Sequence, residues 1–532
     1  MKTMKSSETT RRPDYDPLKV MLLAAGLSLM CFLIQGNIDI NISDEGFLWN
    51  GTIQTALGQI PLLDFQSYDP GRYYWGAAWS KIFGTGIMGL RSSTMMFQIF
   101  GLWFGLLILR RVIRSWWLLT FCGFLLLLWM FPRHKFFEPS IAMATIFFAL
   151  KLFENPTLKQ LFISGLFIGL TAIMGRNFGL YGFISFFLLI VFIWEKIDKS
   201  CLKKRLGLWV VGIGVGYLPM IIMMIVIPGF FECMVQIIND MLRIGYTNMP
   251  ALIPRPWGPD YSLMNLSQGF TTFMTGTIFI ILPFYYLLLF SRIFSYDRQQ
   301  LKQHPVLVAF SFAGVTYMHF PYSCPDFPHL TQSIHPFLLG VLAIPYVFRS
   351  NKIFIFCFMS IILIISLLLV GVVQPIYLKA KAPAGDEYVR YTITGSNLWL
   401  RKSTVNLIDT VKKIDQRLHD DEELLMMPGW AGFYPILEKK APLWKTYFIF
   451  PETEKMQHRM IESLVEKNVN WVIIGDIRFA GLEMLHFPDH HALFWRYLMK
   501  HYESVPVSGL PQNYQLLHRK EKSLLQNINS EK

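Results

Sequence analysis

Charged side chains are scarce in this sequence, and their scarcity excludes an ordinary soluble protein. Asp, Glu, Lys and Arg make up 16% of the 532 residues, whereas a soluble domain typically carries about 25%. Hydrophobic residues reach 53% and aromatic residues 15%. We therefore predict an α-helical polytopic membrane protein with about eleven transmembrane helices. The apolar runs behind this prediction are 18–35, 89–109, 116–131, 139–153, 158–175, 177–194, 206–228, 269–290, 305–320, 334–348 and 353–373.

Ionisable side chains are absent from the middle of these runs and occur only at their ends, as with Arg91, Lys151 and Arg176. Ion-coupled carriers usually hold such groups near the centre of the membrane. The absence counts against a proton-driven carrier. A lipid or polysaccharide transporter stays as the alternative outside the enzymes.

Cysteines are few and form no spacing pattern. Of the six, only Cys233 and Cys324 are expected on the outer side of the membrane. The sequence therefore allows at most one disulfide and gives the cysteines no metal-binding role.

Two runs are short. Segments 116–131 and 139–153 fall below the roughly 20 residues that a helix needs to cross the hydrocarbon. They form either two short spans or one re-entrant hairpin. The hairpin would remove two spans from the count together, so every later segment would keep its side of the membrane. The first run, 18–35, lacks a small-residue cleavage site, so we predict a retained helix instead of a signal peptide.

Lysine and arginine are distributed unevenly between the two sets of loops. This positive-inside pattern predicts a cytoplasmic N-terminus and, with an odd number of spans, an extracytoplasmic C-terminus. It accounts for much of the net charge of +13 without a nucleic-acid partner. The loops expected inside hold Arg110, Arg111, Arg114, Lys151, Lys159, Lys196, Lys199, Lys203, Lys204, Arg205, Arg292, Arg298, Lys302, Arg349 and Lys352.

The composition changes after residue 373. Stretch 386–430 is charged and helix-like, and helices are expected near 452–467 and 490–501. Short apolar strands are expected in "ELLMMP", "TYFIF" and "NWVIIGD". The alternation predicts a small extracytoplasmic α/β domain over 374–532. It lacks a Gly-rich phosphate loop, a metal-spaced His/Cys set and a nucleophile elbow, which favours a lid or acceptor-docking role over a second catalytic centre.

The loops expected outside are crowded with acids and cations. Carboxylates and cations from separate loops would meet at one rim, which suggests a reaction on something reachable from the outer leaflet. The residues concerned are Asp39, Asp44, Glu45, Asp64, Asp69, Arg72, Glu138, Arg176, Asp240, Arg243, Arg255, Asp260, Asp326, His329 and His335.

One outer segment resembles a known family. "SDEGFLWNGTIQTALGQIPLLDFQSYDPGRYYW", directly after the first run, resembles the GT-C membrane glycosyltransferases, especially bacterial relatives of protein O-mannosyltransferases and of the lipid A aminoarabinose transferase. The matching positions are the acidic pair Asp44 and Glu45 and the segment 70–75. "CPDFPHLTQSIHP" is similar to an Arg-x-Asp-x-x-His element at Asp326 and His329, with Cys324 where the Arg would fall.

The resemblance implies a GT-C-like transmembrane domain over 1–373, with a catalytic first outer loop, 36–88. It implies inverting transfer of a sugar from a polyprenyl-phosphate donor to a glycan, lipid or protein acceptor, on the outer face of the bacterial inner membrane. The resemblance leaves open whether a divalent cation assists the transfer. An envelope glycan polymerase or ligase is the alternative among enzymes.

Such a transfer needs a base for the acceptor hydroxyl, and its phosphate leaving group needs cations more than a general acid. Asp44 is the expected base, with Glu45 as its neighbour or as the base itself. The candidate phosphate ligands are Arg72, Arg176, Arg255 and His329. The candidate substrate contacts are Asp69, Tyr73, Tyr74, Trp75 and Asp326.

Each role has a structural alternative. Asp44 precedes an apolar helical face and could serve as an N-cap, which is compatible with catalysis. Asp69-Pro70-Gly71 is an ordinary turn signal. The aromatic residues after it are typical of a membrane-interface belt, and Arg176 and Arg255 could extend to lipid headgroups.

Overall fold

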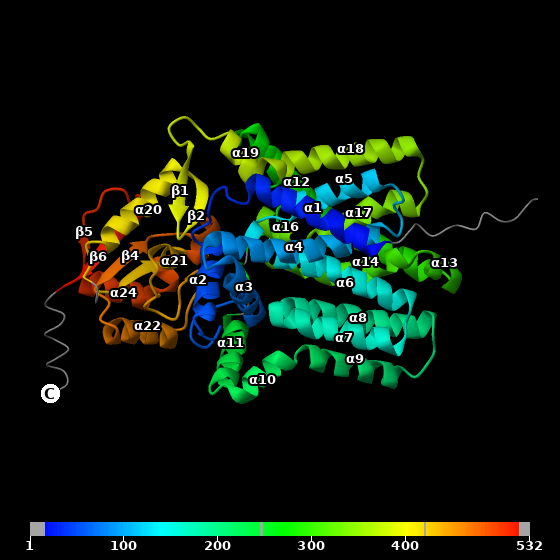
Figure 1. The fold of residues 1–532 in the computed structure, drawn as a ribbon, viewed down its shortest axis with the longest axis horizontal. Coiled ribbons are helices and arrows are strands. Elements are labelled where there is room, and N and C mark those ends of the chain that lie inside the picture. The colour runs from blue at the N-terminus through cyan, green and yellow to red at the C-terminus, as the bar shows by residue number, and fades with distance from the viewer. Residues whose placement is uncertain (1–15, 245–247, 250, 420–421, 521–532) are drawn as a thin grey trace, which may run out of the picture.

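The computed structural model describes residues 16–244, 248–249, 251–419 and 422–520. Long helices lie side by side at one end of the molecule, and the strands gather at the other (Figure 1). Between them lie α2 (Asp44–Ala56) and α3 (Pro70–Phe83), both from the first outer loop. The predicted division into a helical part and an α/β tail is therefore confirmed.

Among the described residues, six helical segments are long and apolar enough to cross a membrane, or eight if each of two bent helix pairs is one span. The predicted count of about eleven is not confirmed. The six are α1 (Pro17–Gln35), α4 (Ile87–Leu109), η1 with α6 (Arg133–Glu154), α8 (Arg176–Lys196), α12 (Leu266–Ser295) and α18 with η3 (Lys352–Val373). Leu22 and Leu33 of α1 are exposed, as expected of side chains that face lipid.

The bent pairs explain part of the difference in count. Helix α9 (Leu202–Gly216) meets α10 (Leu218–Val226) at 56°, and α16 (Phe327–Ser333) meets α17 (His335–Val347) at 60°. Pro219 and Pro336 stand in the first turn after each break, and proline cannot donate the hydrogen bond that would continue the preceding helix. The segment 139–153, expected to be short, is extended by η1 to 22 residues.

Small residues allow close packing among the helices. Gly165 and Gly169 of α7 (Leu158–Met174) face Gly212 and Gly216 of α9, and a Cβ on Gly165 would lie 2.1 Å from the Trp209 carbonyl oxygen. Two small residues four apart on each helix let the backbones approach, which is a common way to join helices in lipid.

The remaining helices are short or lie outside the long segments. They are α5 (Trp116–Trp129), α11 (Phe230–Ile244), η2 (Tyr261–Leu263), α13 (Arg298–Gln303), α14 (Pro305–Tyr317), α15 (His319–Ser323), α19 (Pro375–Ala380), α20 (Lys402–Asp415), α21 (Phe433–Leu437), α22 (Glu454–Glu466), η4 (Phe479–Gly481), η5 (Glu483–Leu485), α23 (Phe487–His490) and α24 (Ala492–His501).

The tail contains two sheets. A hairpin pairs β1 (Tyr388–Ile393) with β2 (Ser396–Arg401), and a four-stranded sheet has the order β3-β4-β6-β5. Its strands are β3 (Leu424–Met427), β4 (Trp471–Gly475), β5 (Tyr502–Val505) and β6 (Tyr514–Arg519). β3 and β4 run parallel, whereas β6 is antiparallel to both of its neighbours.

The predicted strands at 423–428 and 470–476 are confirmed by β3 and β4, and the helices near 452–467 and 490–501 by α22 and α24. Two expectations are wrong. Residues 388–401 form the hairpin and not a helix, because their apolar side chains alternate and Gly395, at φ +73°, supplies the turn. Residues 446–450 form no strand, because the amides of Thr446 and Tyr447 both donate to the side chain of Gln66, and Phe448 N donates to the Pro428 carbonyl.

The tail is attached to the first outer loop by several backbone contacts. Gly432 N donates to Ile42 O at 2.9 Å, and Trp399 N donates to Asn37 O at 2.8 Å. The indole of Trp444 donates to the carbonyls of Leu62 and Leu63. The α/β domain therefore covers the end of the helical domain at which the first outer loop lies (Figure 1).

Candidate active site

The start of α2 places Asp44 and Glu45 in opposite environments. Asn41, three residues before the helix, accepts hydrogen bonds from the backbone N–H groups of Ser43 and Asp44, at 3.0 and 2.8 Å. Asp44 is the first residue of the helix and not the residue before it. The N-cap interpretation of Asp44 is therefore wrong: the amides that such a cap would bond, those of Gly46 and Phe47, donate instead to the backbone carbonyls of Asn41 and Ser43.

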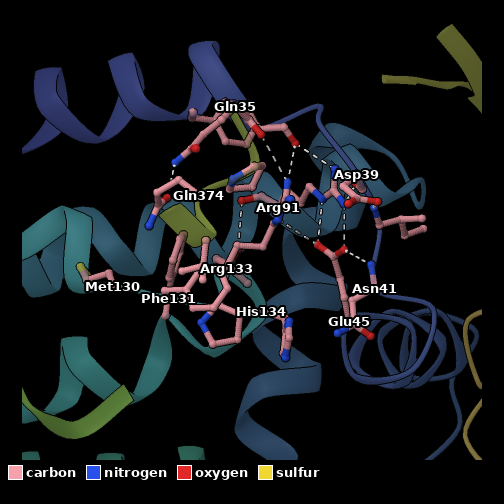
Figure 2. A pocket seen from close by; sticks show the side chains of 18 of the residues that line it. Gln35, Asp39, Asn41, Glu45, Arg91, Met130, Phe131, Arg133, His134 and Gln374 are labelled. Carbon is pink, nitrogen blue, oxygen red and sulfur yellow. Dashed lines mark hydrogen bonds and ion pairs between the residues drawn. The ribbon is translucent and has the colours of Figure 1, made fainter. Parts of the chain in front are cut away.

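Glu45 points inward and forms a buried ion pair with Arg91 of α4 (Figure 2). Both oxygens are used: Nε of Arg91 lies 2.8 Å from Oε1 and an Nη lies 2.7 Å from Oε2. Only 2% of either side chain is exposed. Burial raises the pKa of Glu45, but the nearby charges of Arg91 and Arg133 outweigh that effect and lower it to about 2. Glu45 is a fixed anion that holds Arg91.

Asp44 remains accessible. Its side chain is 38% exposed, and one carboxylate oxygen accepts a hydrogen bond from the hydroxyl of Tyr447, which belongs to the tail. The other oxygen lies 3.9 Å from Nε2 of His134. Burial raises the pKa of Asp44, but the charges of His134 and Lys135 and the bond from Tyr447 hold it below its usual value. The carboxylate is therefore ionised and can accept a proton from a bound hydroxyl.

A cavity of about 480 Å³ is lined by Glu45 and Arg91 and has an apolar and a polar part (Figure 2). Asp44 is not part of the lining but lies 3.9 Å from His134, which is. The apolar wall comes from α1, from the end of α5 and the loop after it, and from the chain around α19. Its members are Phe32, Leu127, Met130, Phe131, Val373 and Leu378. The polar part is lined by Gln35, Asp39, Asn41, Glu45, Arg91, Gln98, Arg133, His134 and Gln374. An amphipathic ligand with an anionic head matches this distribution.

Arg133 carries positive charge that Glu45 does not fully offset. Its guanidinium donates to the backbone carbonyls of Gln35, Gly36 and Ile38, and its Nε lies 3.8 Å from Glu45 Oε1. That separation is beyond hydrogen-bond distance. Glu45 is thus shared between two guanidinium groups, of which Arg91 holds it directly.

A second carboxylate, Asp39, also lines this end of the cavity. Asp39 accepts a hydrogen bond from the hydroxyl of Tyr388, which also accepts one from Arg401. Among the charged side chains that line the cavity, Arg91 and Arg133 therefore face Glu45 and Asp39, and Arg401 reaches Asp39 only through the Tyr388 hydroxyl.

The arginines expected to bind phosphate have other partners. Arg72 is buried, with an Nη 2.7 Å from Glu138 and Nε 2.7 Å from the carbonyl of Met174. Arg176 forms a 2.7 Å ion pair with Asp69, whose other oxygen accepts from the backbone amide of Arg176. Asp69 thereby joins the start of α3 to the start of α8.

Arg255 is exposed in the chain before α12 and does not line the cavity. The three aromatic residues that were expected to contact the substrate lie in different surroundings. Tyr73 is fully buried, and its hydroxyl accepts from the backbone of Tyr68. Trp75 donates to the carbonyl of Ser93, and Tyr74 is 41% exposed. The cavity is lined by none of these three described side chains.

Asp326 and His329 lie on the same rim as Asp44. The charge of His329 acts on Asp44, and Asp326 begins α16 by accepting from the backbone and imidazole of His329. The structure thus brings together Asp44, Glu45, Asp326 and His329, whereas Arg72 and Arg176 bind carboxylates nearby and Arg255 lies apart. Cys233 and Cys324 are both free, so the one disulfide that the sequence allowed does not form.

Sequence reasoning assigned no role to Arg91, Arg133, His134, Lys135 and Tyr447. Three of them are consecutive in "FPRHKFFEP", directly after a short apolar run, and this basic group at an outer loop was the available signal. Tyr447 had no such signal, because it reaches Asp44 from 403 residues away along the chain.

No protein-family model and no curated protein sequence matches this chain. Solved structures do match. ArnT from Cupriavidus metallidurans bound to undecaprenyl phosphate is 12% identical, with a TM-score of 0.54, over 95% of this chain and 98% of that one. The apo form of that protein gives 0.47, and the oligosaccharyltransferase AglB from Archaeoglobus fulgidus, in complex with an inhibitory peptide and a dolichol-phosphate, gives 0.45, each at 12% identity. They cover 94% and 95% of this chain, and the matches span 97% and 76% of those chains. The likeness to ArnT over nearly the whole of both chains shows that this chain has a GT-C-type fold.

Proposed function

We propose that this chain is an integral membrane glycosyltransferase that moves a sugar from a polyprenyl-phosphate donor to a cell-envelope acceptor on the outer face of the membrane. The observation that carries the proposal is the cavity, with its apolar wall, a polar end that holds Arg91 and Arg133, and the accessible carboxylate of Asp44 next to His134 of the cavity lining. A polyprenyl phosphate has the same division into an apolar chain and an anionic head. The structural neighbour ArnT was solved with undecaprenyl phosphate bound.

Asp44 is the proposed base. The acceptor hydroxyl oxygen attacks the anomeric carbon, the bond from that carbon to the phosphate oxygen breaks, and the hydroxyl proton passes to Asp44. A single displacement of this kind inverts the anomeric carbon. Glu45 is left out of the base role because both of its oxygens are bonded to Arg91 in a buried site.

Arg133, with His134 and His329, is proposed to hold the donor phosphate. The departing phosphate keeps its negative charge, and a fixed cation is worth more in a site with little water than in bulk solvent. Arg133 lines the cavity and lies 3.8 Å from the carboxylate that it shares with Arg91. Arg72 and Arg176 are proposed to fix the outer loops, since each binds a carboxylate from another segment.

The test compares envelope glycans from cells that lack the gene and cells that carry wild type, Asp44→Asn or Asp64→Asn. Asp64 is the matched control, because it is a carboxylate of the same loop that accepts from Ile60 N, whereas Asp44 lies 3.9 Å from His134 of the cavity wall. Mass spectrometry should detect one additional sugar per acceptor in the wild-type and Asp64→Asn cells. Loss of a positioned base costs on the order of 10²–10⁴ in rate, so the Asp44→Asn glycans should match those of the deletion. Identical glycans in the deletion and the wild-type cells would contradict a transferase function. Full activity of Asp44→Asn would contradict the assignment of Asp44 as the base.

A further inference from the structure

Three side chains of different chemistry converge where α15 ends and α16 begins. The thiol of Cys324, the carboxylate of Asp326 and the imidazole of His329 each offer one ligand atom, and these atoms lie within 4.8 Å of one another. Sγ of Cys324 lies 3.5 Å from Oδ2 of Asp326, and Nδ1 of His329 lies 2.8 Å from Oδ1. Ligand atoms around a tetrahedral zinc ion are roughly 3–4 Å apart, because its bonds are about 2.0–2.3 Å long. Small side-chain movements would therefore close the cluster around an ion.

A helix cap does not explain all three residues. Asp326 alone satisfies the start of α16, since its Oδ1 accepts from the backbone N–H of His329 at 2.7 Å. That cap needs neither a thiol nor an imidazole. Cys324 is nevertheless almost fully buried beside the carboxylate, and the side chain of His329 is only 18% exposed. Pro325 and Pro328 stand between the three residues and fix φ at their positions, which restrains the backbone that spaces them.

We propose that Cys324, Asp326 and His329 bind a divalent transition-metal ion of the zinc type and leave a fourth position open. Mixed sulfur, nitrogen and oxygen donors suit zinc, whereas Mg²⁺ and Ca²⁺ prefer oxygen alone. On binding, the thiol releases its proton to solvent, and the ion lies between the resulting thiolate, the imidazole and the carboxylate. The expectation that the cysteines have no metal-binding role failed to foresee this cluster, because its single cysteine gives no Cys-x-x-Cys spacing.

The ion would lie on the rim that holds the proposed base. Thr331, two residues after His329, donates to the carbonyl of Phe131, which lines the cavity, and the charge of His329 contributes to the lowered pKa of Asp44. An open coordination position there could take a phosphate oxygen. That role beside the donor rests on the proposed transferase function, whereas ion binding itself does not.

The test uses the full-length protein in detergent, purified with a tag free of histidine, stripped with a chelator and titrated with Co²⁺. A cobalt–thiolate bond gives a charge-transfer absorption band that histidine and carboxylate ligands do not produce. Wild type should bind one Co²⁺ per chain with this band, and Zn²⁺ should abolish it by displacement. Absence of this band from the Co²⁺-titrated wild-type protein would overturn the proposal.

Variants identify the ligands and control for folding. Cys324→Ser should lose the band, and His329→Ala should weaken Co²⁺ binding by at least about tenfold. Asp326→Asn should weaken it similarly while keeping the helix cap, because Asn caps as well as Asp does. The matched control is Cys233→Ser, whose thiol lies apart, against the carbonyl of Leu62, and should leave band and affinity unchanged. A band that persists in Cys324→Ser would overturn the site.

No donor or acceptor enters this titration, so its failure leaves the transferase proposal standing, and the reverse also holds. Adding undecaprenyl phosphate to the Co²⁺-loaded protein tests the role beside the donor. A shifted cobalt spectrum supports that role, and an unchanged spectrum overturns it.

Discussion

At the scale of single residues, two neighbouring acids that look equivalent in the sequence have different surroundings. Asp44 is partly exposed and hydrogen-bonded to a tyrosine, whereas Glu45 is buried against Arg91. Sequence position was enough to single out the pair, because it follows the first apolar run. It could not separate the two side chains, because their difference depends on Arg91, Arg133 and Tyr447, which lie far away along the chain.

Glu45→Gln is therefore expected to lower the stability of the folded protein. We expect it to leave Arg91 buried without its carboxylate, and breaking a buried ion pair costs about 3–5 kcal/mol. Yield and melting temperature in detergent should fall well below those of wild type and of Asp44→Asn. Equal melting temperatures for the three proteins would show that the pair contributes little.

The same pair sets a direction for pH dependence. The pKa of Glu45 in the folded protein is about 2, below the ordinary value of 4.5. A lowered pKa means that the carboxylate stabilises the fold above the ordinary value and that this stabilisation is lost as the pH falls toward the folded pKa. Wild type should lose melting temperature between about pH 4.5 and pH 2, and Glu45→Gln should lose less over that interval. A wild-type melting temperature that stays constant there would contradict the assignment.

At the scale of elements, the sequence predicted which segments are apolar better than where they bend or end. Hydropathy located α1, α4, α8, α12 and α18, because each is a continuous apolar run. It did not distinguish a straight span from a pair broken at proline, as in α9 with α10. The segment 446–450 has the composition of a strand, yet the amides of Thr446 and Tyr447 bond to Gln66, which lies 380 residues from Thr446 and which no local pattern reveals.

Helix α2 meets the tail through two glycines, which gives a test of the contact between elements. A Cβ on Gly46 would lie 2.4 Å from the Cα of Gly432, so Gly46→Ala must push the tail backbone away from α2. Overpacking of this kind typically costs about 1–3 kcal/mol. Gly46→Ala should lower the melting temperature and the transfer rate together, because Tyr447 reaches Asp44 from the displaced domain. The control is Gly26→Ala on α1, where a Cβ would meet nothing within 4 Å, and an equal effect of both changes would contradict the close contact.

At the scale of the whole molecule, the site exists only when the helical domain and the tail are together. Asp44 and Glu45 come from the first outer loop, Arg133 and His134 from the chain before α6, and Tyr447 from the tail. The tail had been assigned a lid or docking role because it lacks a catalytic motif. The contact of its Tyr447 with Asp44 agrees with such a role: the tail would cover the cavity and also supply one hydrogen bond to the proposed base.

The arrangement of the two domains also predicts their sides of the membrane. The connection between α8 and α9 lies at the end of the helices opposite the tail (Figure 1), and it is basic, with Lys199 in the loop and Lys203 and Lys204 in the first turn of α9. Loops rich in Lys and Arg stay in the cytoplasm, so the tail and the cavity beside it should lie outside. Alkaline phosphatase, which is active only outside the cytoplasm, should be active when fused after Lys532, and green fluorescent protein fused there should stay dark. The same two reporters inserted between α8 and α9 should give the opposite result. A fluorescent, phosphatase-negative fusion after Lys532 would place Asp44 and the cavity on the cytoplasmic side, where a donor presented at the outer leaflet could not reach them.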